Sequence, residues 1–310
     1  MAKNFIEEYV SINGISQYFL HIPNTGKEVV IMLHGGPGLA NSYAAYYQQP
    51  YADFCNVVYY DQRGAGKTQL KNKVSSDSLS LDVLIEDLRQ TIEYVKQKYT
   101  TDSVFLLGHS WGTMLGTLYI IKYPQTVAGY IGYGQVVATA TQDRRYYEYV
   151  KAAVLKSGNH EDIIALKGVS DAFPNVAREE YFKEYSILSG VGYKYDFMAH
   201  DVFEIYCESP IWTPEDEAQA EGIEEFNEKL YEEVLSGYDI RAIKEYHVPV
   251  YYILGRHDEM TPSAMAAEYF ETIQAPKKGL YWIEDAGHLM DTDNPSAFFG
   301  VVKEIVTRDA

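Results

Sequence analysis

The sequence predicts an α/β fold in which a mostly parallel, twisted β-sheet is covered by helices on both faces. Short apolar runs recur along the chain between polar segments, as expected of buried strands. Helical patterns separate several of these runs, and such alternation is typical of a parallel sheet. The chain begins differently, with an antiparallel hairpin over residues 9–20 whose turn is Asn13-Gly14.

After the hairpin, strand and helix patterns follow one another. The expected strands cover residues 28–33, 56–60, 103–107, 128–133, 249–254 and 280–283. A helix with one apolar stripe is predicted from Leu81 to Val95. A second helix is predicted from Thr113 to Tyr123, where Pro124 ends it.

The alternation stops between residues 138 and 245. This stretch is rich in tyrosine and acidic residues and has helical patterns, for example from Ile223 to Leu235. It is far longer than an ordinary connection between two strands of one sheet. We therefore expect a helical cap domain at residues 138–245, inserted into a main domain made of residues 1–137 and 246–310.

Composition restricts the possible partners and the location. The chain has 310 residues with 44 acidic and 26 basic side chains, a net charge of −18. Such a charge disfavours nucleic acid and anionic membranes as partners. Cys55 and Cys207 are too few for a disulfide framework or a zinc site. The first residues are acidic where a signal peptide is apolar, and no apolar run reaches membrane-spanning length, so we expect a cytoplasmic protein.

Residues 108–112 read Gly-His-Ser-Trp-Gly, a G-x-S-x-G motif between a predicted strand and a predicted helix. This context is that of a nucleophile elbow, a tight turn that holds a serine hydroxyl at the end of a strand. Small residues are needed at Gly108 and Gly112, where the backbones crowd. The motif predicts Ser110 as a nucleophile.

A serine nucleophile needs a base and an acid that orients the base. Two later strand patterns are followed by suitable residues, Asp258 after residues 249–254 and His288 after residues 280–283. Parallel strands bring such loops to one edge of a sheet. Glu259, Asp285 and Asp291 are alternative acids, but Asp258 has the expected strand-end position and chain order.

An oxyanion hole requires the amide after the nucleophile and an amide on an earlier loop. His34-Gly35-Gly36-Pro37-Gly38 follows a strand pattern, and its backbone can closely approach a substrate. We therefore predict that the amides of Gly36 and Trp111 form the hole. A phosphate-binding loop is disfavoured, because no Lys-Ser/Thr pair closes the pattern at residues 34–38 and Asp61 replaces the first glycine needed before Gly66-Lys67-Thr68.

Five stretches together resemble the α/β-hydrolase superfamily and, within it, the prolyl aminopeptidase (proline iminopeptidase) family of serine peptidases. They are His34-Gly35-Gly36-Pro37-Gly38, Asp61-Gln62-Arg63-Gly64-Ala65-Gly66, Gly108-His109-Ser110-Trp111-Gly112, Gly255-Arg256-His257-Asp258 and Gly287-His288. The resemblance implies an α/β-hydrolase catalytic domain with Ser110, Asp258 and His288 as its triad. The chain departs from the family at Thr68, where serine is usual, and lacks the family's tryptophan-rich cap segment.

We therefore expect a serine hydrolase that uses no cofactor or metal and cleaves a small molecule or short peptide through an acyl-enzyme. The resemblance favours an aminopeptidase that releases N-terminal residues. A small-molecule esterase or lactonase would use the same triad, and a non-catalytic binding protein could share the scaffold. The sequence does not set the oligomeric state.

An aminopeptidase must hold a charged ammonium, which requires a carboxylate in the pocket. Glu204 and Glu208 are four residues apart near Tyr206 and would share one face of a helix. We expect at least one of these two glutamates to contact the substrate amine.

Overall fold

The computed structural model describes residues 4–24, 27–198, 202–235 and 237–308. Its centre is an eight-stranded sheet with the order β1-β2-β4-β3-β5-β6-β7-β8. The strands are β1 (Ile6–Ile12), β2 (Ile15–Ile22), β3 (Val29–Leu33), β4 (Asn56–Tyr60), β5 (Val104–His109), β6 (Val127–Tyr133), β7 (Val250–Gly255) and β8 (Lys278–Ile283). Strand β2 is antiparallel to β1 and β4, and the other neighbours are parallel. This confirms the predicted fold class.

The structure confirms the predicted N-terminal hairpin and its Asn-Gly turn. Asn13 and Gly14 both have positive φ, 44° and 79°, as the tight turn between two antiparallel strands requires. Ser11 pairs with Ser16 and Ile12 with Ile15 across this turn. The hairpin therefore forms the antiparallel edge of an otherwise parallel sheet.

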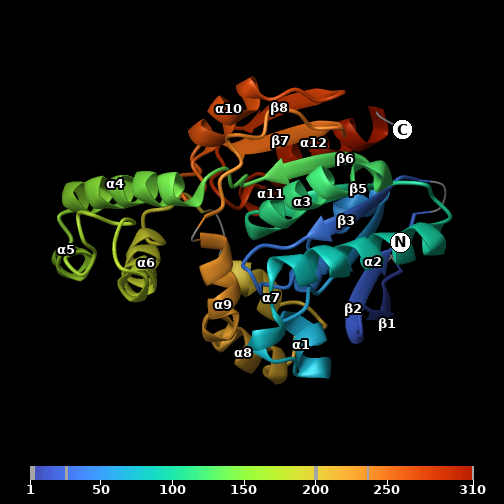
Figure 1. Cartoon of the computed structure of the whole chain (residues 1–310), viewed down its shortest axis with the longest axis horizontal. Helices are drawn as coiled ribbons and strands as arrows, with labels where there is room; N and C mark the ends of the chain where they lie inside the picture. Colours follow the sequence, from blue (N-terminus) through green and yellow to red (C-terminus); the bar gives the residue numbers. More distant parts are fainter. Residues whose placement is uncertain (1–3, 25–26, 199–201, 236, 309–310) are drawn as a thin grey trace.

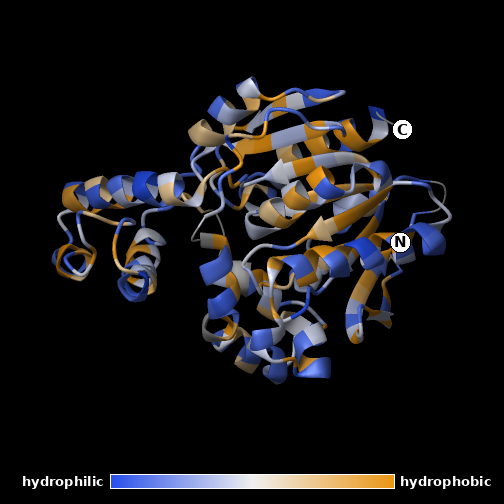
Figure 2. Cartoon of the chain, in the orientation of Figure 1, coloured by the Kyte–Doolittle hydropathy of each residue, from blue (hydrophilic) through white to orange (hydrophobic). Residues whose placement is uncertain are grey.

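Helices cover both faces of the sheet, and each face has its own apolar core. Within β3, Val29, Ile31 and Leu33 belong to one core, while Val30 and Met32 belong to the other. The first core also contains apolar residues of α2 (Leu81–Tyr99), α3 (Trp111–Lys122) and α10 (Ser263–Thr272). The second contains those of α12 (Pro295–Arg308) and of the short helix η1 (Asn41–Tyr46). Figure 2 shows hydrophobic residues concentrated along the central strands.

The stretch between β6 and β7 holds six helices among its described residues: α4 (Thr139–Ser157), α5 (His160–Leu166), α6 (Arg178–Gly192), α7 (Val202–Cys207), α8 (Pro214–Glu221) and α9 (Ile223–Leu235). Helices α4, α5 and α6 project from one side of the molecule (Figure 1) and share a small core that includes Val150, Phe173 and Leu188. Helices α7, α8 and α9 lie closer to the sheet, where α8 contacts α1 (Gly66–Asn72). The stretch therefore has two lobes.

A buried cluster of polar groups joins the lobe formed by α7, α8 and α9 to the rest of the protein. The Lys67 ammonium on α1 lies 3.0 Å from Oδ2 of Asp216 on α8. The Tyr43 hydroxyl on η1 donates to the other oxygen of this carboxylate at 2.7 Å. Asp216 also completes a capping box with Thr213 at the start of α8.

Replacing Gly112 with alanine should destabilise the fold. The added Cβ would lie 2.0 Å from the carbonyl oxygen of Leu33, so α3 would have to move away from β3. Overpacking of this kind costs about 1–3 kcal/mol. Urea unfolding should therefore show a lower midpoint for Gly112→Ala than for the parent.

Gly300→Ala is the matched control for this experiment. Gly300 lies on α12 with nothing within 4 Å of its added Cβ, and alanine is favoured over glycine inside helices. Its midpoint should equal or exceed that of the parent. A Gly112→Ala midpoint as high as that of Gly300→Ala would contradict the close packing of α3 on β3.

Candidate active site

Ser110 occupies a strained turn between β5 and α3. Its backbone angles are φ 51° and ψ −118°, a region that costs a residue with a Cβ about 1–3 kcal/mol and is commonly associated with functional sites. Glycine is required on both sides, because a Cβ on Gly108 would lie 2.7 Å from the carbonyl oxygen of Gly112. The Ser110 amide donates to the carbonyl of Tyr133 at 3.1 Å, which ties the turn to β6.

The structure brings His288 and Asp258 together. Nδ1 of His288 lies 3.0 Å from Oδ2 of Asp258, and the two residues are 7 % and 3 % exposed. Asp258 follows β7 and His288 follows β8, so adjacent parallel strands carry the two loops. The alternative acid Asp285, which lies on the same loop as His288, is exposed to solvent.

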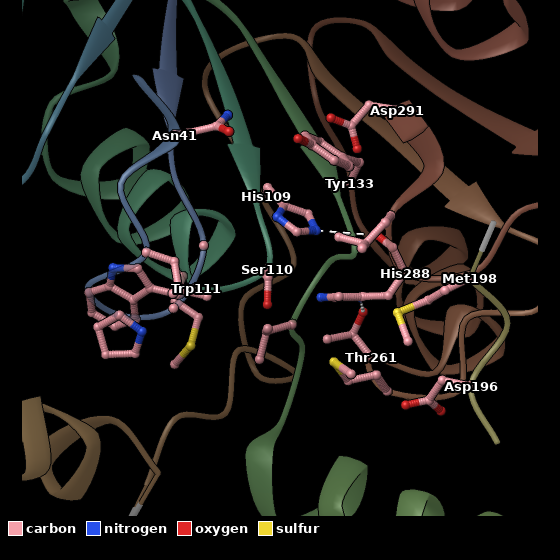
Figure 3. A pocket seen from close by; sticks show the side chains of 18 of the residues that line it. Asn41, His109, Ser110, Trp111, Tyr133, Asp196, Met198, Thr261, His288 and Asp291 are labelled. Atoms are coloured by element: carbon pink, nitrogen blue, oxygen red, sulfur yellow. Dashed lines mark hydrogen bonds between the residues drawn. The ribbon is translucent and has the colours of Figure 1, made fainter. Parts of the chain in front are cut away.

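Thr261 contacts both members of this pair, a role that was not predicted from the sequence. Its amide donates to Oδ1 of Asp258 at 2.9 Å, and its hydroxyl donates to Oδ2 at 2.7 Å. The same hydroxyl oxygen lies 3.1 Å from Nδ1 of His288. Because Nδ1 faces a carboxylate, it carries the ring proton, which leaves Nε2 as the acceptor. In Figure 3 the Ser110 hydroxyl and the free edge of the His288 ring point toward the same space.

Burial of His288 and the charges around it shift its pKa in opposite directions. Burial lowers the pKa of His288, but the carboxylate of Asp258 raises it by charge and by hydrogen bonding, as do the charges of Asp196 and Asp291. The net result is a pKa above the ordinary value of 6.5. The site therefore favours a positive charge on this imidazole.

His109, the last residue of β5, supports the His288 loop. Its Nε2–H donates to the carbonyl oxygen of His288 at 3.2 Å, and its ring stacks on Tyr133. Burial and the nearby His288 hold the pKa of His109 well below its ordinary value. His109 is therefore a neutral residue that supports the active-site backbone.

The glycine-rich loop after β3 is held in place by hydrogen bonds from inside the protein. The backbone N–H of Gln62 donates to Nε2 of His34 at 3.1 Å. Nδ1–H of His34 donates to the carbonyl oxygen of Gly35 at 2.9 Å. Burial lowers the pKa of His34 to about 4, so the ring stays neutral. The side chain of Gln62 accepts from the indole of Trp111 at 3.0 Å. These bonds join the loop, the Asp61–Gly66 segment and the start of α3.

Arg63 anchors the Asp61–Gly66 segment to α2 and to the N-terminal hairpin. Its guanidinium makes two hydrogen bonds to the buried carboxylate of Asp87 on α2, at 2.8 and 3.0 Å, and a third to the carbonyl of Asn13. Thr68 accepts from the Tyr18 amide and donates to the carbonyl of Asp61. Both bonds use only the hydroxyl group of Thr68, which a serine also has.

A cavity of about 280 Å³ opens over Ser110. Gly36, Trp111 and His288 line it, and helices α4, α7 and α9 contribute further residues. Three carboxyl groups also line it, those of Asp143, Asp196 and Asp291. Among its described lining residues, none is lysine or arginine. The cavity is therefore acidic.

Glu204 and Glu208 do not contribute to this lining. Both are exposed on or just beyond α7, while their neighbour Tyr206 is buried and does line the cavity. Sequence spacing placed the two glutamates on one face, but that face points to solvent. The acidic residues of the cavity come instead from α4, from the segment before α7 and from α11 (Met290–Asp293).

Asp196 and Asp291 lie on opposite sides of His288 in Figure 3. Burial raises the pKa of each to about 6. Oδ2 of Asp291 accepts from Gln48 at 2.6 Å, and Oδ2 of Asp196 accepts from the Tyr146 hydroxyl at 2.6 Å. Oδ1 of Asp196 is buried and has no hydrogen-bond partner among the described residues. This oxygen therefore lacks a donor among the described residues, although Asp196 lines the cavity.

The described residues contain no group of three or more His, Cys, Asp or Glu side chains arranged to hold a metal ion. None of the described helices combines the length and the apolar character needed to cross a membrane.

Residues 28–295 match the family described as the alpha/beta hydrolase fold. The chain belongs to this family. It is a hydrolase of that family, with the eight-stranded sheet and the strand-end loops that the fold requires.

Relatives of this hydrolase include named peptidases. It is 22% identical over 298 residues to the probable aminopeptidase YbaC of Bacillus subtilis, covering 94% of this chain and 90% of the relative. It is 24% identical to a proline iminopeptidase of Heyndrickxia coagulans, covering 97% and 99% of the two chains. The crystal structure of a proline iminopeptidase-related protein from Thermus thermophilus superposes with a TM-score of 0.72 at 18% identity, covering 99% and 100%.

Replacing Asp258 with asparagine should lower the pKa of His288. The substitution removes the charge and hydrogen bond that raise this pKa and leaves the burial that lowers it. NMR titration of the imidazole nitrogens measures the change. Asp285→Asn removes a nearby exposed acid and should leave the pKa of His288 unchanged. An unchanged pKa in Asp258→Asn would contradict the assigned contact.

Proposed function

We propose that this hydrolase is a serine enzyme that cleaves a small substrate through an acyl-enzyme, with Ser110, His288 and Asp258 as its triad. The observation that carries this proposal is the strained Ser110 turn facing the buried His288–Asp258 pair across one cavity. A strained serine beside an oriented imidazole is the arrangement that nucleophilic catalysis needs.

The proposed mechanism uses the hydrogen bond that orients His288 against Asp258. Nε2 of His288 accepts the Ser110 proton as Oγ attacks the acyl carbon, and Asp258 stabilises the resulting imidazolium. The imidazolium then protonates the leaving group as its bond to the acyl carbon breaks. Water repeats the sequence on the acyl-enzyme and restores the serine.

The oxyanion of each tetrahedral intermediate is held by the amides of Gly36 and Trp111. Trp111 is the first residue of α3, so its N–H has no partner within the helix. Gly36 has a φ of 111°, a conformation suited to glycine, and it lines the cavity. Each donor contributes about 3 kcal/mol of transition-state stabilisation in hydrolases of this kind.

The acidic cavity favours an aminopeptidase over an esterase. A substrate with a free amino terminus brings an ammonium close to its scissile carbonyl, and a buried carboxylate is the natural partner for it. Asp196 interacts electrostatically with both His288 and Asp258, so it lies close to the reacting groups. Its unpartnered Oδ1 is the acceptor that we assign to the substrate ammonium. The peptidases among the relatives support the same choice.

Residues 138–245 act as a cap in this proposal. They supply Asp143, Asp196 and Tyr206 to the cavity lining, while the main domain supplies the triad. The cap therefore selects the substrate and the main domain performs the reaction.

Ser110→Ala should abolish turnover of an aminoacyl-arylamide and leave the fold intact. Loss of the nucleophile lowers kcat by about 10⁶-fold in a serine hydrolase. Alanine removes one hydroxyl, so the thermal unfolding midpoint should stay near that of the parent. Turnover by Ser110→Ala at the parental rate would contradict the assignment of the nucleophile.

Asp196→Asn should weaken the preference for a free amine. The parent should hydrolyse an aminoacyl-arylamide much faster than its N-acetylated form, and the asparagine variant should narrow this ratio by about 10- to 100-fold, because it loses a charge-assisted hydrogen bond. The measurement is kcat/KM for both substrates.

Glu204→Gln and Glu208→Gln are the controls for this comparison, since both side chains are exposed outside the cavity. They should keep the parental ratio. Equal hydrolysis of the free and acetylated substrates by the parent, or a strong preference for simple aryl esters, would overturn the aminopeptidase proposal and favour the esterase.

A further inference from the structure

The cavity has a second group of acceptors along α4. Gln142 and Asp143 both line the cavity and are 9 % and 5 % exposed. Oε1 of Gln142 is buried and has no hydrogen-bond partner among the described residues. Oδ2 of Asp143 accepts from the Tyr181 hydroxyl at 2.8 Å. An unpartnered buried acceptor is costly unless a donor reaches it from the cavity.

Asp143 lacks the positive charge that a buried carboxylate requires. Burial raises the pKa of Asp143 to about 7, and the Tyr181 hydrogen bond only partly offsets this effect. Asp143 also lines a neighbouring cavity that contains Arg178, but the guanidinium there pairs with Glu232 on α9. A cationic ligand group would stabilise the ionised carboxylate and satisfy Gln142 as well.

This second group is connected to the proposed ammonium site through α4. Tyr146 follows Asp143 by three residues on α4, and such residues are neighbours on one face of a helix, roughly 5–6 Å apart at Cβ. The Tyr146 hydroxyl donates to Asp196. A substrate residue whose α-ammonium binds Asp196 can therefore direct a long side chain along α4 toward Asp143.

We propose that Asp143 and Gln142 bind a second positive charge, so that the preferred substrate carries an N-terminal residue with a basic side chain, such as lysine or arginine. The ammonium or guanidinium donates to both acceptors, and the α-ammonium occupies Asp196. This inference rests on the proposed aminopeptidase activity and adds the identity of the residue that is released. The acidic lining, free of lysine and arginine among its described residues, suits such a dication.

The test compares lysyl-arylamide with norleucyl-arylamide, whose side chain has nearly the same length and shape but no charge. The parent should show a kcat/KM about 10- to 100-fold higher for the lysyl substrate, as expected for a charge-assisted hydrogen bond. Asp143→Asn should reduce this ratio to near one. The ratio in the parent tests the proposal even if the variant folds poorly.

Glu148→Gln is the matched control, because Glu148 lies on the same helix but is exposed and pairs with Arg144. It should keep the parental lysyl-to-norleucyl ratio. A parent that hydrolyses norleucyl- and prolyl-arylamides at least as well as the lysyl substrate would overturn this inference and leave the aminopeptidase proposal standing. A parent that hydrolyses none of these amides but cleaves aryl esters would overturn both.

Discussion

The hydrogen bond between Nδ1 of His288 and the carboxylate of Asp258 joins two loops that are thirty residues apart in the sequence. Both groups are buried, so neither can rely on water for its partner, and removal of one would leave the other uncompensated. Thr261 binds Asp258 through its amide and its hydroxyl. His109 holds the backbone of His288 from β5. The carboxyl ends of β5, β7 and β8 thus meet around one imidazole.

Close backbone contacts keep these loops in position and explain several glycines. A Cβ on Gly255 would lie 2.1 Å from the carbonyl oxygen of Gly287, and a Cβ on Gly287 would lie 2.2 Å from that of Phe197. The first contact sets the distance between the Asp258 and His288 loops. The second places the segment before α7 directly over the His288 loop. A Cβ on Gly38 would clash with Ile223 of α9, so α9 packs closely against the glycine-rich loop.

Much of the main domain could be predicted from the sequence, because its signals are local. The Asn13-Gly14 turn, the apolar strands and the helix from Ile223 to Leu235 all appear in the structure. The contact between Asp258 and His288 followed from strand-end positions. Thr261 and His109 could not be assigned in this way, since their roles depend on which loops meet across the sheet. The acids of the cavity were also missed. Helical spacing relates Glu204 to Glu208, but only the packing of the lobes decides that Asp143 and Asp196 face inward.

We propose that Ser110 is a nucleophile that His288 activates. Treatment of the protein with a fluorophosphonate, followed by mass spectrometry of its peptides, tests this claim directly, because such reagents modify a serine only where an adjacent base and an oxyanion hole assist the attack. We expect one adduct, on the peptide that contains Ser110, and its loss in His288→Ala. Absence of an adduct on Ser110, or equal labelling in His288→Ala, would contradict the role of Ser110 as nucleophile.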